Sequence, residues 1–466
     1  MKNKRNVIVL ISLLLAVLII GAGIPLYIVN SNKKEQAEKI AEEKNRGLGK
    51  YSEFEIFQNV PVMTRKDVIY TKAAEVGGGD YLITAENTLL EDYQDYLAVL
   101  EKEGFKKLLD NGEQGLEGYV YTAHYQKDSL MVIVSHIVNL QKTTITASEN
   151  TVLSERLYKD ENLVTYASDA KTKLHVLELE SAGMGFLIQL KNGHFLLYDG
   201  GVKGELQYLL DYMESLVPEG SKPIIDAWLI SHAHIDHMGI LAAFSGNKSF
   251  VDRVSVESIY FTEPSQKAEK LNGNVDGVTS NLVFCRTAAE FMKNSEGGKP
   301  DMYRFRTGER YYFEDITTDV IYTPELLAEE EWDTWNASSV VLMVTIEGQK
   351  VLLTGDADWC SQLVYTEMYD KEYFNLTVYQ VPHHGINVYR QLTNRLGTIM
   401  TAVYPSKGVS GDAGEAAFTG RKPQNAHLVS MSLESFGYGD GTRVLTFPYE
   451  VGTSETLQQK FVVEEE

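Results

Sequence analysis

The feature that most constrains this chain is a dense run of potential metal ligands, His232, His234, Asp236 and His237. The apolar segment 224–230 leads directly into this run and, being too short for a helix, predicts a buried strand. Imidazole nitrogens and carboxylate oxygens are the ligands that borderline divalent metals prefer. Because alternate residues of an extended segment share one face, His232 and His234 can hold one ion, while Asp236 and His237 turn toward a second. The run therefore predicts a metal centre at a sheet edge, where open α/β folds place their sites.

The composition is that of an ordinary globular protein, with 466 residues, 44% of them hydrophobic and 23% charged. This length allows two or three domains and a large core. The formal net charge is −22, so extended binding to duplex nucleic acid is disfavoured, although a metal-lined pocket can still bind one phosphate. The two cysteines, Cys285 and Cys360, form no Cys-x-x-Cys pattern, which argues against a cysteine zinc site. Whether they pair with each other stays open.

The N-terminus predicts a membrane anchor. Residues 7–29 are uncharged and long enough to cross a bilayer, and Lys2, Lys4 and Arg5 precede them. A cleavable signal peptide would have a shorter apolar region. The positive end should stay in the cytoplasm, so we expect a single-pass protein of the cell membrane whose C-terminal domains are extracellular.

Charge and turn patterns divide the chain into segments. The segment before the large domain reads as a small α+β domain of unknown role, with a helix that Thr88 caps and Gly104 ends. His124 and His136 lie on its strands without ligand-type neighbours and are expected to be structural. The expected segments are a cytoplasmic start and anchor at 1–30, a charged stalk at 31–50, the small domain at 51–150, a linker at 151–170, a large α/β domain at 171–455 and an acidic tail at 456–466.

Further polar motifs of the large domain follow apolar strands. No histidine stands between His237 and Asp356 in the sequence. The motifs are Asp199-Gly200-Gly201 after a hairpin, Trp335-Asn336-Ala337-Ser338-Ser339, Thr354-Gly355-Asp356, Val381-Pro382-His383-His384-Gly385 and Pro423-Gln424-Asn425-Ala426-His427.

With the ligand run, these motifs resemble the metallo-β-lactamase superfamily. The segments Asn-x-Ser-Ser-Val-Val-Leu, Leu-Leu-Thr-Gly-Asp and His-His-Gly resemble its branch with the extracellular domain of the DNA-uptake protein ComEC. The His-His-Gly segment is also similar to that of bacterial phosphorylcholine esterases. The resemblance covers about 173–449 and implies a four-layer αβ/βα sandwich with a metal pair at the sheet edges. ComEC-type channels have many membrane segments and this sequence predicts one, so we do not expect such a channel.

The resemblance implies a role for each motif. Asp356 looks like the carboxylate that bridges two ions, and two dications a few Å apart do need a shared anion. Asp199 is similar to a residue that orients the ligand turn through hydrogen bonds. The implied ligands are His232, His234 and Asp356 for the first metal, and Asp236, His237, Asp356 and His384 for the second.

Asn336 stands near the place where many members of the superfamily carry a third histidine for the first metal. An amide oxygen at this position would shift the preference of the site from zinc, the metal we expect, toward harder ions such as manganese. Two other interpretations stay open: Asn336 contacts the substrate, or it forms an ordinary turn before the next strand.

A metal pair of this kind produces hydroxide at neutral pH and holds the attacking and leaving oxygens of an ester. Asp236 can orient that hydroxide, while His383 or His427 can contact a phosphoryl oxygen or protonate the leaving group. The sequence thus predicts a membrane-anchored, extracellular, dinuclear metal hydrolase, preferably of a small phosphoester or a cell-envelope substrate. Hydrolysis of a lactone, thioester or amide is the alternative within the same chemistry. A non-catalytic surface-binding protein is the alternative outside enzymes.

Overall fold

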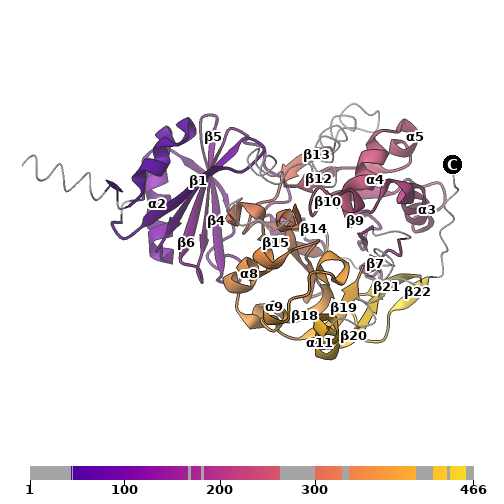
Figure 1. The fold of residues 1–466 in the computed structure, drawn as a ribbon. Helices are drawn as coiled ribbons and strands as arrows, with labels where there is room; N and C mark the ends of the chain where they lie inside the picture. Colours follow the sequence, from indigo (N-terminus) through magenta and orange to yellow (C-terminus); the bar gives the residue numbers. More distant parts are fainter. Residues whose placement is uncertain are drawn as a thin grey trace, which may run out of the picture.

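The computed structural model describes residues 43–44, 46–63, 65–165, 169–179, 183–262, 300–327, 335–405, 423–437 and 441–457. The predicted anchor at 7–29 and Cys285 lie outside the described residues. Within the described ranges, no helix is both long enough and apolar enough to span a membrane. Figure 1 shows a sheet domain from the N-terminal part of the chain beside a larger α/β body.

The N-terminal domain is an antiparallel sheet with the strand order β1-β2-β6-β5-β4-β3, covered on one face by a helix. The helix α2 (Leu90–Lys102) buries Tyr93, Tyr96 and Leu100, which share one helical face by their spacing of three and four. The strands are β1 (Ile69–Glu75), β2 (Asp80–Glu86), β3 (Lys106–Asp110), β4 (Val120–Lys127), β5 (Leu130–Ile137) and β6 (Lys142–Ser148).

The start of α2 differs from the prediction. Leu89 is the N-cap, and its backbone N–H donates to Asp92 Oδ2 at 2.7 Å. Thr88 does not cap the helix because its hydroxyl donates to the carbonyl of Gln141 at 3.1 Å, which ties this end of the helix to the loop before β6. The strands β1 and β3 were not predicted, since charged residues interrupt their apolar pattern.

Two further sheets form the larger body. One has nine strands in the order β13-β12-β10-β9-β8-β7-β21-β22, with β11 beside β10, and the other has seven in the order β14 to β20. The strands of the first are β7 (Lys173–Val176), β8 (Gly185–Gln189), β9 (Phe195–Asp199), β10 (Ile224–Leu229), β11 (Ser255–Val256), β12 (Ser258–Phe261), β13 (Asp301–Arg304), β21 (Thr442–Thr446) and β22 (Glu455–Leu457). Those of the second are β14 (Arg310–Phe313), β15 (Ile316–Tyr322), β16 (Val341–Ile346), β17 (Gln349–Leu353), β18 (Leu376–Gln380), β19 (Ile399–Tyr404) and β20 (Ser432–Gly437).

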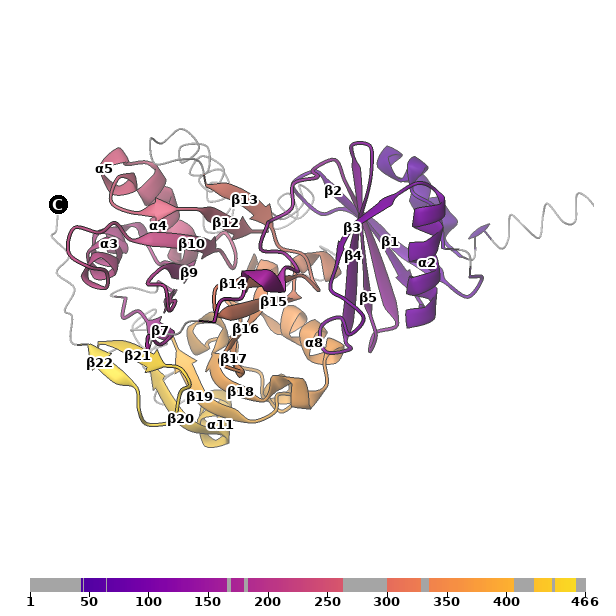
Figure 2. The ribbon, with the colours of Figure 1, turned by 180° about the vertical axis from the view of Figure 1, so that it is seen from behind.

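Alternate residues of β16 show how these layers are built. Leu342, Val344 and Ile346 join the core that the two sheets share. Val341 and Met343 point the other way and join the core beneath the helices of the second sheet. Helices lie beside each sheet (Figures 1 and 2): α3 (Leu206–Ser215), α4 (Ile235–Ser245) and α5 (Lys248–Val251) beside the first, α8 (Trp359–Met368), α9 (Arg390–Thr393) and α11 (Pro423–Met431) beside the second. This mixed α/β body is consistent with the fold that the resemblance implied.

A buried ionic contact joins the N-terminal sheet to the larger body. Arg306, in the turn between β13 and β14, places Nη2 2.8 Å from Asp80 Oδ2. On the same turn, Glu309 Oε1 lies 3.2 Å from His124 Nε2. Gly308, between them, has φ +92°, and an added Cβ would lie 2.1 Å from a hydroxyl oxygen of β4, so the turn accepts only glycine.

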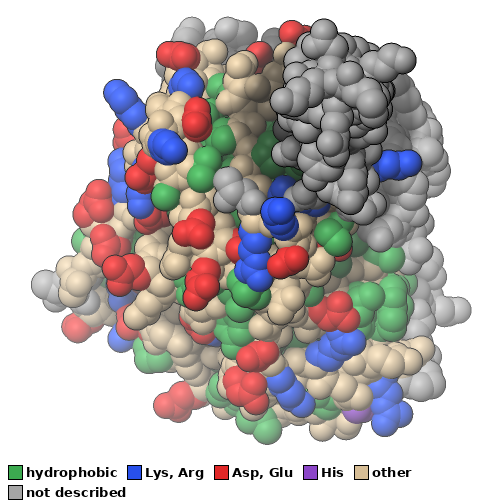
Figure 3. Space-filling model, turned by 90° about the vertical axis from the view of Figure 1, so that its left-hand side faces the viewer, with side chains coloured by type: hydrophobic (Ala, Val, Ile, Leu, Met, Phe, Trp, Pro, Cys, Tyr) green, Lys and Arg blue, Asp and Glu red, His purple; other side chains and the backbone are tan. Residues whose placement is uncertain are grey.

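Acidic and basic side chains are interspersed on the face shown in Figure 3.

Candidate metal centre

The end of β10 positions the ligand run. His232 and His234 stand in the extended segment after the strand, and α4 begins at Ile235 with His234 as its N-cap. Asp236 and His237 therefore lie in the first turn of the helix. The carbonyl of Asp236 accepts a hydrogen bond from the backbone N–H of Met184 at 3.0 Å, which anchors this turn to the start of β8.

Asp356 reaches the same place from the second sheet, after β17. Its backbone N–H donates to Ser339 Oγ at 3.1 Å. The preceding Gly355 has φ +53°, and a Cβ there would lie 2.8 Å from Ser231 Cβ, so this turn passes close to the residue before His232. Gln380 Nε2 donates to the Gly355 carbonyl at 2.9 Å and holds the turn in place.

The His-His-Gly turn, η10 (Pro382–Gly385), contains three successive residues in the left-handed region. The φ angles are +50° at His383, +55° at His384 and +85° at Gly385. A non-glycine residue in this region costs of order 1–3 kcal/mol and clusters at functional sites. His384 Nδ1 donates to the carbonyl of Pro405 at 2.6 Å, and Asn425 Nδ2 donates to that of Gly385 at 3.0 Å. The first contact leaves His384 Nε2 as the electron-pair donor.

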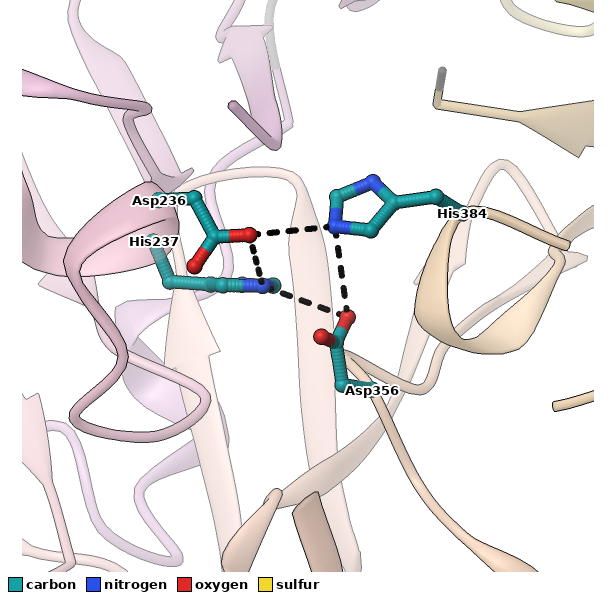
Figure 4. Close-up of side chains that lie close together, drawn as sticks. All are labelled: Asp236, His237, Asp356 and His384. Atoms are coloured by element: carbon teal, nitrogen blue, oxygen red, sulfur yellow. Dashed lines mark ion pairs between the residues drawn. The ribbon is translucent and has the colours of Figure 1, made fainter. Parts of the chain in front are cut away.

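Four side chains converge in one group, formed by Asp236, His237, Asp356 and His384 (Figure 4), with ligand atoms all within 4.8 Å of one another. His237 Nε2 lies 3.2 Å from Asp356 Oδ1 and 3.8 Å from Asp236 Oδ2. His384 Nε2 lies 3.4 Å from Asp236 Oδ2 and 3.8 Å from Asp356 Oδ1. In Figure 4, the first two residues enter from α4 and His384 enters from the opposite side.

A second group contains His232, His234 and Asp356, again with ligand atoms within 4.8 Å of one another. His232 Nε2 lies 2.8 Å from His234 Nδ1 and 3.9 Å from Asp356 Oδ2. Asp356 therefore belongs to both groups, with Oδ1 turned to the first and Oδ2 to the second. The structure thus brings together all six residues that the sequence analysis named as ligands.

Buried atoms at this centre fit divalent cations. His237 Nε2, His384 Nε2 and Asp356 Oδ1 have no hydrogen-bond partner among the described residues. Each unsatisfied buried atom costs about 1–3 kcal/mol, and a cation would satisfy all three. Burial, with the rings of His237 and His234, lowers the pKa of His232 and keeps it in the neutral form that binds metal.

Asp199 supports the ligands from behind. This buried residue, at φ +56°, accepts hydrogen bonds from the Ser231 backbone N–H (2.7 Å), from Ser231 Oγ (2.8 Å) and from His237 Nδ1 (2.8 Å). Ser231 Oγ in turn lies 2.9 Å from His232 Nδ1. Burial alone would lower the pKa of His237, but the carboxylates of Asp356 and Asp199 raise it well above its usual range. The centre is therefore rich in negative charge, which suits cations.

Of the other predicted site residues, His383 and Asn336 lie beside the metal centre and His427 does not. His383 Nε2 lies 3.7 Å from Asp356 Oδ2, and Asn336 Nδ2, on η8 (Trp335–Ser338), lies 3.2 Å from His383 Nδ1. His427 is not in either group, because its Nε2 lies 2.7 Å from Asn394 Oδ1.

Two supporting residues were missed by the sequence analysis, Ser231 and Gln380. The signal that could have found Gln380 is its position as the polar end of an apolar strand, β18.

A match to one protein family agrees with this geometry. Residues 181–387, which include all six ligands, match the metallo-beta-lactamase superfamily. This part of the chain is therefore similar to a metallo-beta-lactamase superfamily domain. Such a domain indicates a metal-dependent hydrolase.

No curated protein matches the chain. Among solved structures, zinc-bound PqqB from Methylobacterium extorquens is similar over 42% of this chain and 58% of its own, with 11% sequence identity and a TM-score of 0.27. The match thus spans less than two thirds of PqqB.

Substitution of Asn336 tests its part in the candidate metal centre. We expect Asn336→His to raise the zinc affinity of the His232 group, because an imidazole replaces an amide. Asn336→Ala should lower turnover about tenfold, because His383 loses a neighbour that orients it. Competitive zinc and manganese titrations of both variants and the parent protein, with turnover measured in parallel, check this. Identical behaviour of the three proteins would assign Asn336 to turn formation alone.

Proposed function

We propose that the chain is a membrane-anchored extracellular hydrolase of phosphoesters that uses two divalent metal ions, with zinc favoured over manganese. The observation that supports this most is the placement of Asp356 between two ligand groups, with one carboxylate oxygen turned to each. When bound, two such cations would polarise a phosphoryl oxygen and lower the pKa of water, which is the chemistry that phosphoester hydrolysis needs. The shared carboxylate offsets the repulsion between the ions.

The exposure of the side chains supports a different role for each of two residues. Asp236 and His383 have side chains that are 25% and 26% exposed, whereas the other ligands of the Asp236 group are buried. Asp236 is therefore placed to orient a water molecule and accept its proton. His383 is placed to donate to a phosphoryl or leaving-group oxygen. We assign no step to His427.

We also propose the ComEC-type branch and the four-layer sandwich for this domain. The motifs of that branch carry Asn336, Asp356 and His384, and the three residues lie around one centre. The substrate is a small phosphoester or a phosphoester of the cell envelope. The formal net charge of −22 disfavours duplex nucleic acid as a partner.

A substrate panel tests the reaction. The full chain in detergent, loaded with zinc or manganese, is assayed with bis(4-nitrophenyl) phosphate, 4-nitrophenyl phosphate, a γ-lactone and a thioester, and its metal content is measured. We expect about two metal ions per chain and the fastest turnover with a phosphoester, lost on chelation. Faster turnover of the lactone or thioester would assign carbonyl hydrolysis instead. A protein without stoichiometric metal would be a binding protein.

Protease treatment of intact cells tests the proposed topology. The uncharged span 7–29 and the preceding Lys2, Lys4 and Arg5 support an anchor with the domains outside. We expect added protease to degrade the domains on intact cells. Degradation only after lysis would contradict the proposed orientation.

A further inference from the structure

A cavity of about 240 Å³ lies next to the His-His-Gly turn. It is lined by Val388, Tyr389, Arg390, Gln391 and Gln424. The first four follow His384 closely in the chain. Gln424 adjoins Asn425, whose amide donates to the carbonyl of Gly385. The wall of the cavity and the turn that presents His384 are therefore parts of one hydrogen-bonded unit.

Two contacts also tie this wall to the Asp356 turn. Asn387 Nδ2 donates to the carbonyl of Asp356 at 3.1 Å. The ring of Trp359, three residues after Asp356, packs edge-on against the ring of Tyr389 with centroids 5.1 Å apart. Val388 follows His384 by four residues, and a residue spans at most about 3.5 Å of chain, so this side of the cavity lies within about 14 Å of the His384 backbone.

Arg390 gives this cavity an uncompensated positive charge. It is exposed. Among the arginines that the structure describes, it alone has no side-chain hydrogen bond, ion pair or aromatic contact. A guanidinium offers paired donors that match the oxygens of a carboxylate or phosphate, and the amides of Gln391 and Gln424 can add donors.

We propose that this cavity binds a second anionic group of the substrate, away from the bond that is hydrolysed, and that Arg390 recognises it. The anionic group is a carboxylate or a phosphate. The identity of the cleaved bond rests on the proposed function. The preference of the cavity for an anion rests on Arg390 alone. Arg390 then decides which esters bind and takes no part in the chemical step.

A pair of phosphodiesters tests this selectivity. The substrates are 4-nitrophenyl phenyl phosphate and its analogue with a carboxylate on the phenyl ring. We expect Arg390→Gln to raise the KM of the metal-loaded full chain for the carboxylate analogue about tenfold, the loss typical of one charged hydrogen bond, and to leave kcat unchanged. The KM for the parent diester should not change. Arg390→Lys should keep part of the preference, because it keeps the charge.

The matched control is Arg395→Gln. Arg395 lies five residues further along, pairs with Glu367 at 3.1 Å and does not line the cavity. It should behave like the parent protein with both diesters. Equal KM changes for the two diesters in Arg390→Gln, or none for either, would overturn the proposal.

A binding measurement separates this proposal from the proposed function. Calorimetric titration of the full chain with benzenesulfonate and with methyl phenyl sulfone compares a charged probe with a neutral one. We expect Arg390→Gln to weaken benzenesulfonate binding about tenfold and to leave the sulfone unaffected, whichever ester the chain hydrolyses. Equal benzenesulfonate affinity in the parent protein and Arg390→Gln would overturn the assignment of the cavity, even if phosphoesters prove to be the substrates.

Discussion

Asp356→Asn should remove both metal ions from the chain and abolish hydrolysis. The carboxylate of Asp356 turns one oxygen to each ligand group, so its substitution removes a ligand from both at once. An amide is neutral and cannot offset the repulsion between two dications. Because loss of a residue that merely orients a ligand already costs 10–100-fold, we expect turnover to fall by more than about a hundredfold. Metal content per chain and turnover are the measurements.

Asp358→Asn is the matched control for this variant. Asp358 lies two residues away and caps α8 by accepting from the backbone N–H groups of Cys360 and Ser361. Asparagine caps a helix about as well as aspartate, so this protein should fold normally and hold two ions. Two ions per chain in Asp356→Asn would show that Asp356 does not bridge the two groups.

The ligand set could be read from the sequence because its residues are close together or follow strands. His232, His234 and His237 lie within six consecutive residues, so their mutual distance is limited by the chain itself. Asp356 and His384 are far from them in the sequence. Their placement rested on the order of motifs in a resembling family, and the pairing of two sheets brings them to the same point.

The hydrogen-bond partners that support the ligands could not be predicted from the sequence. Ser231 hydrogen-bonds to Asp199, and Pro405 offers only a carbonyl, which every residue has. No residue type marks such contacts, because they depend on the path of the backbone. His427 shows the opposite error: a histidine in a suggestive motif lies against Asn394, because the register of α11 turns it there.

The contact between the two domains was also invisible in the sequence. Arg306 and Asp80 are separated by 226 residues, and each alone looks like a surface charge. In the structure both are buried, with Arg304 Nη1 at 3.2 Å from Asp80 as well. Burial opposes the charge of Asp80, but Arg306 and Arg304 outweigh this and lower its pKa. The interface therefore depends on charges that must stay paired.

Arg306→Met should destabilise the protein by about 3–5 kcal/mol, the usual cost of leaving one member of a buried ion pair without its partner. Asp80 would still pair with Arg304, so the expected loss of stability lies toward the lower end of this range. The metal content should remain at two ions per chain, since no ligand comes from the N-terminal sheet. Urea unfolding gives the free energy of unfolding, and limited proteolysis reports whether the two domains separate.

Arg253→Met is the control, because Arg253 pairs on the surface with Asp211 and Glu214, whose side chains are 58% and 40% exposed. Exposed pairs contribute about 0–1 kcal/mol, so this variant should unfold almost like the parent protein. Equal stability of the two variants would show that Arg306 is no more important than a surface charge. Loss of metal in Arg306→Met without a change in unfolding would instead mean that the N-terminal sheet shapes the metal centre directly.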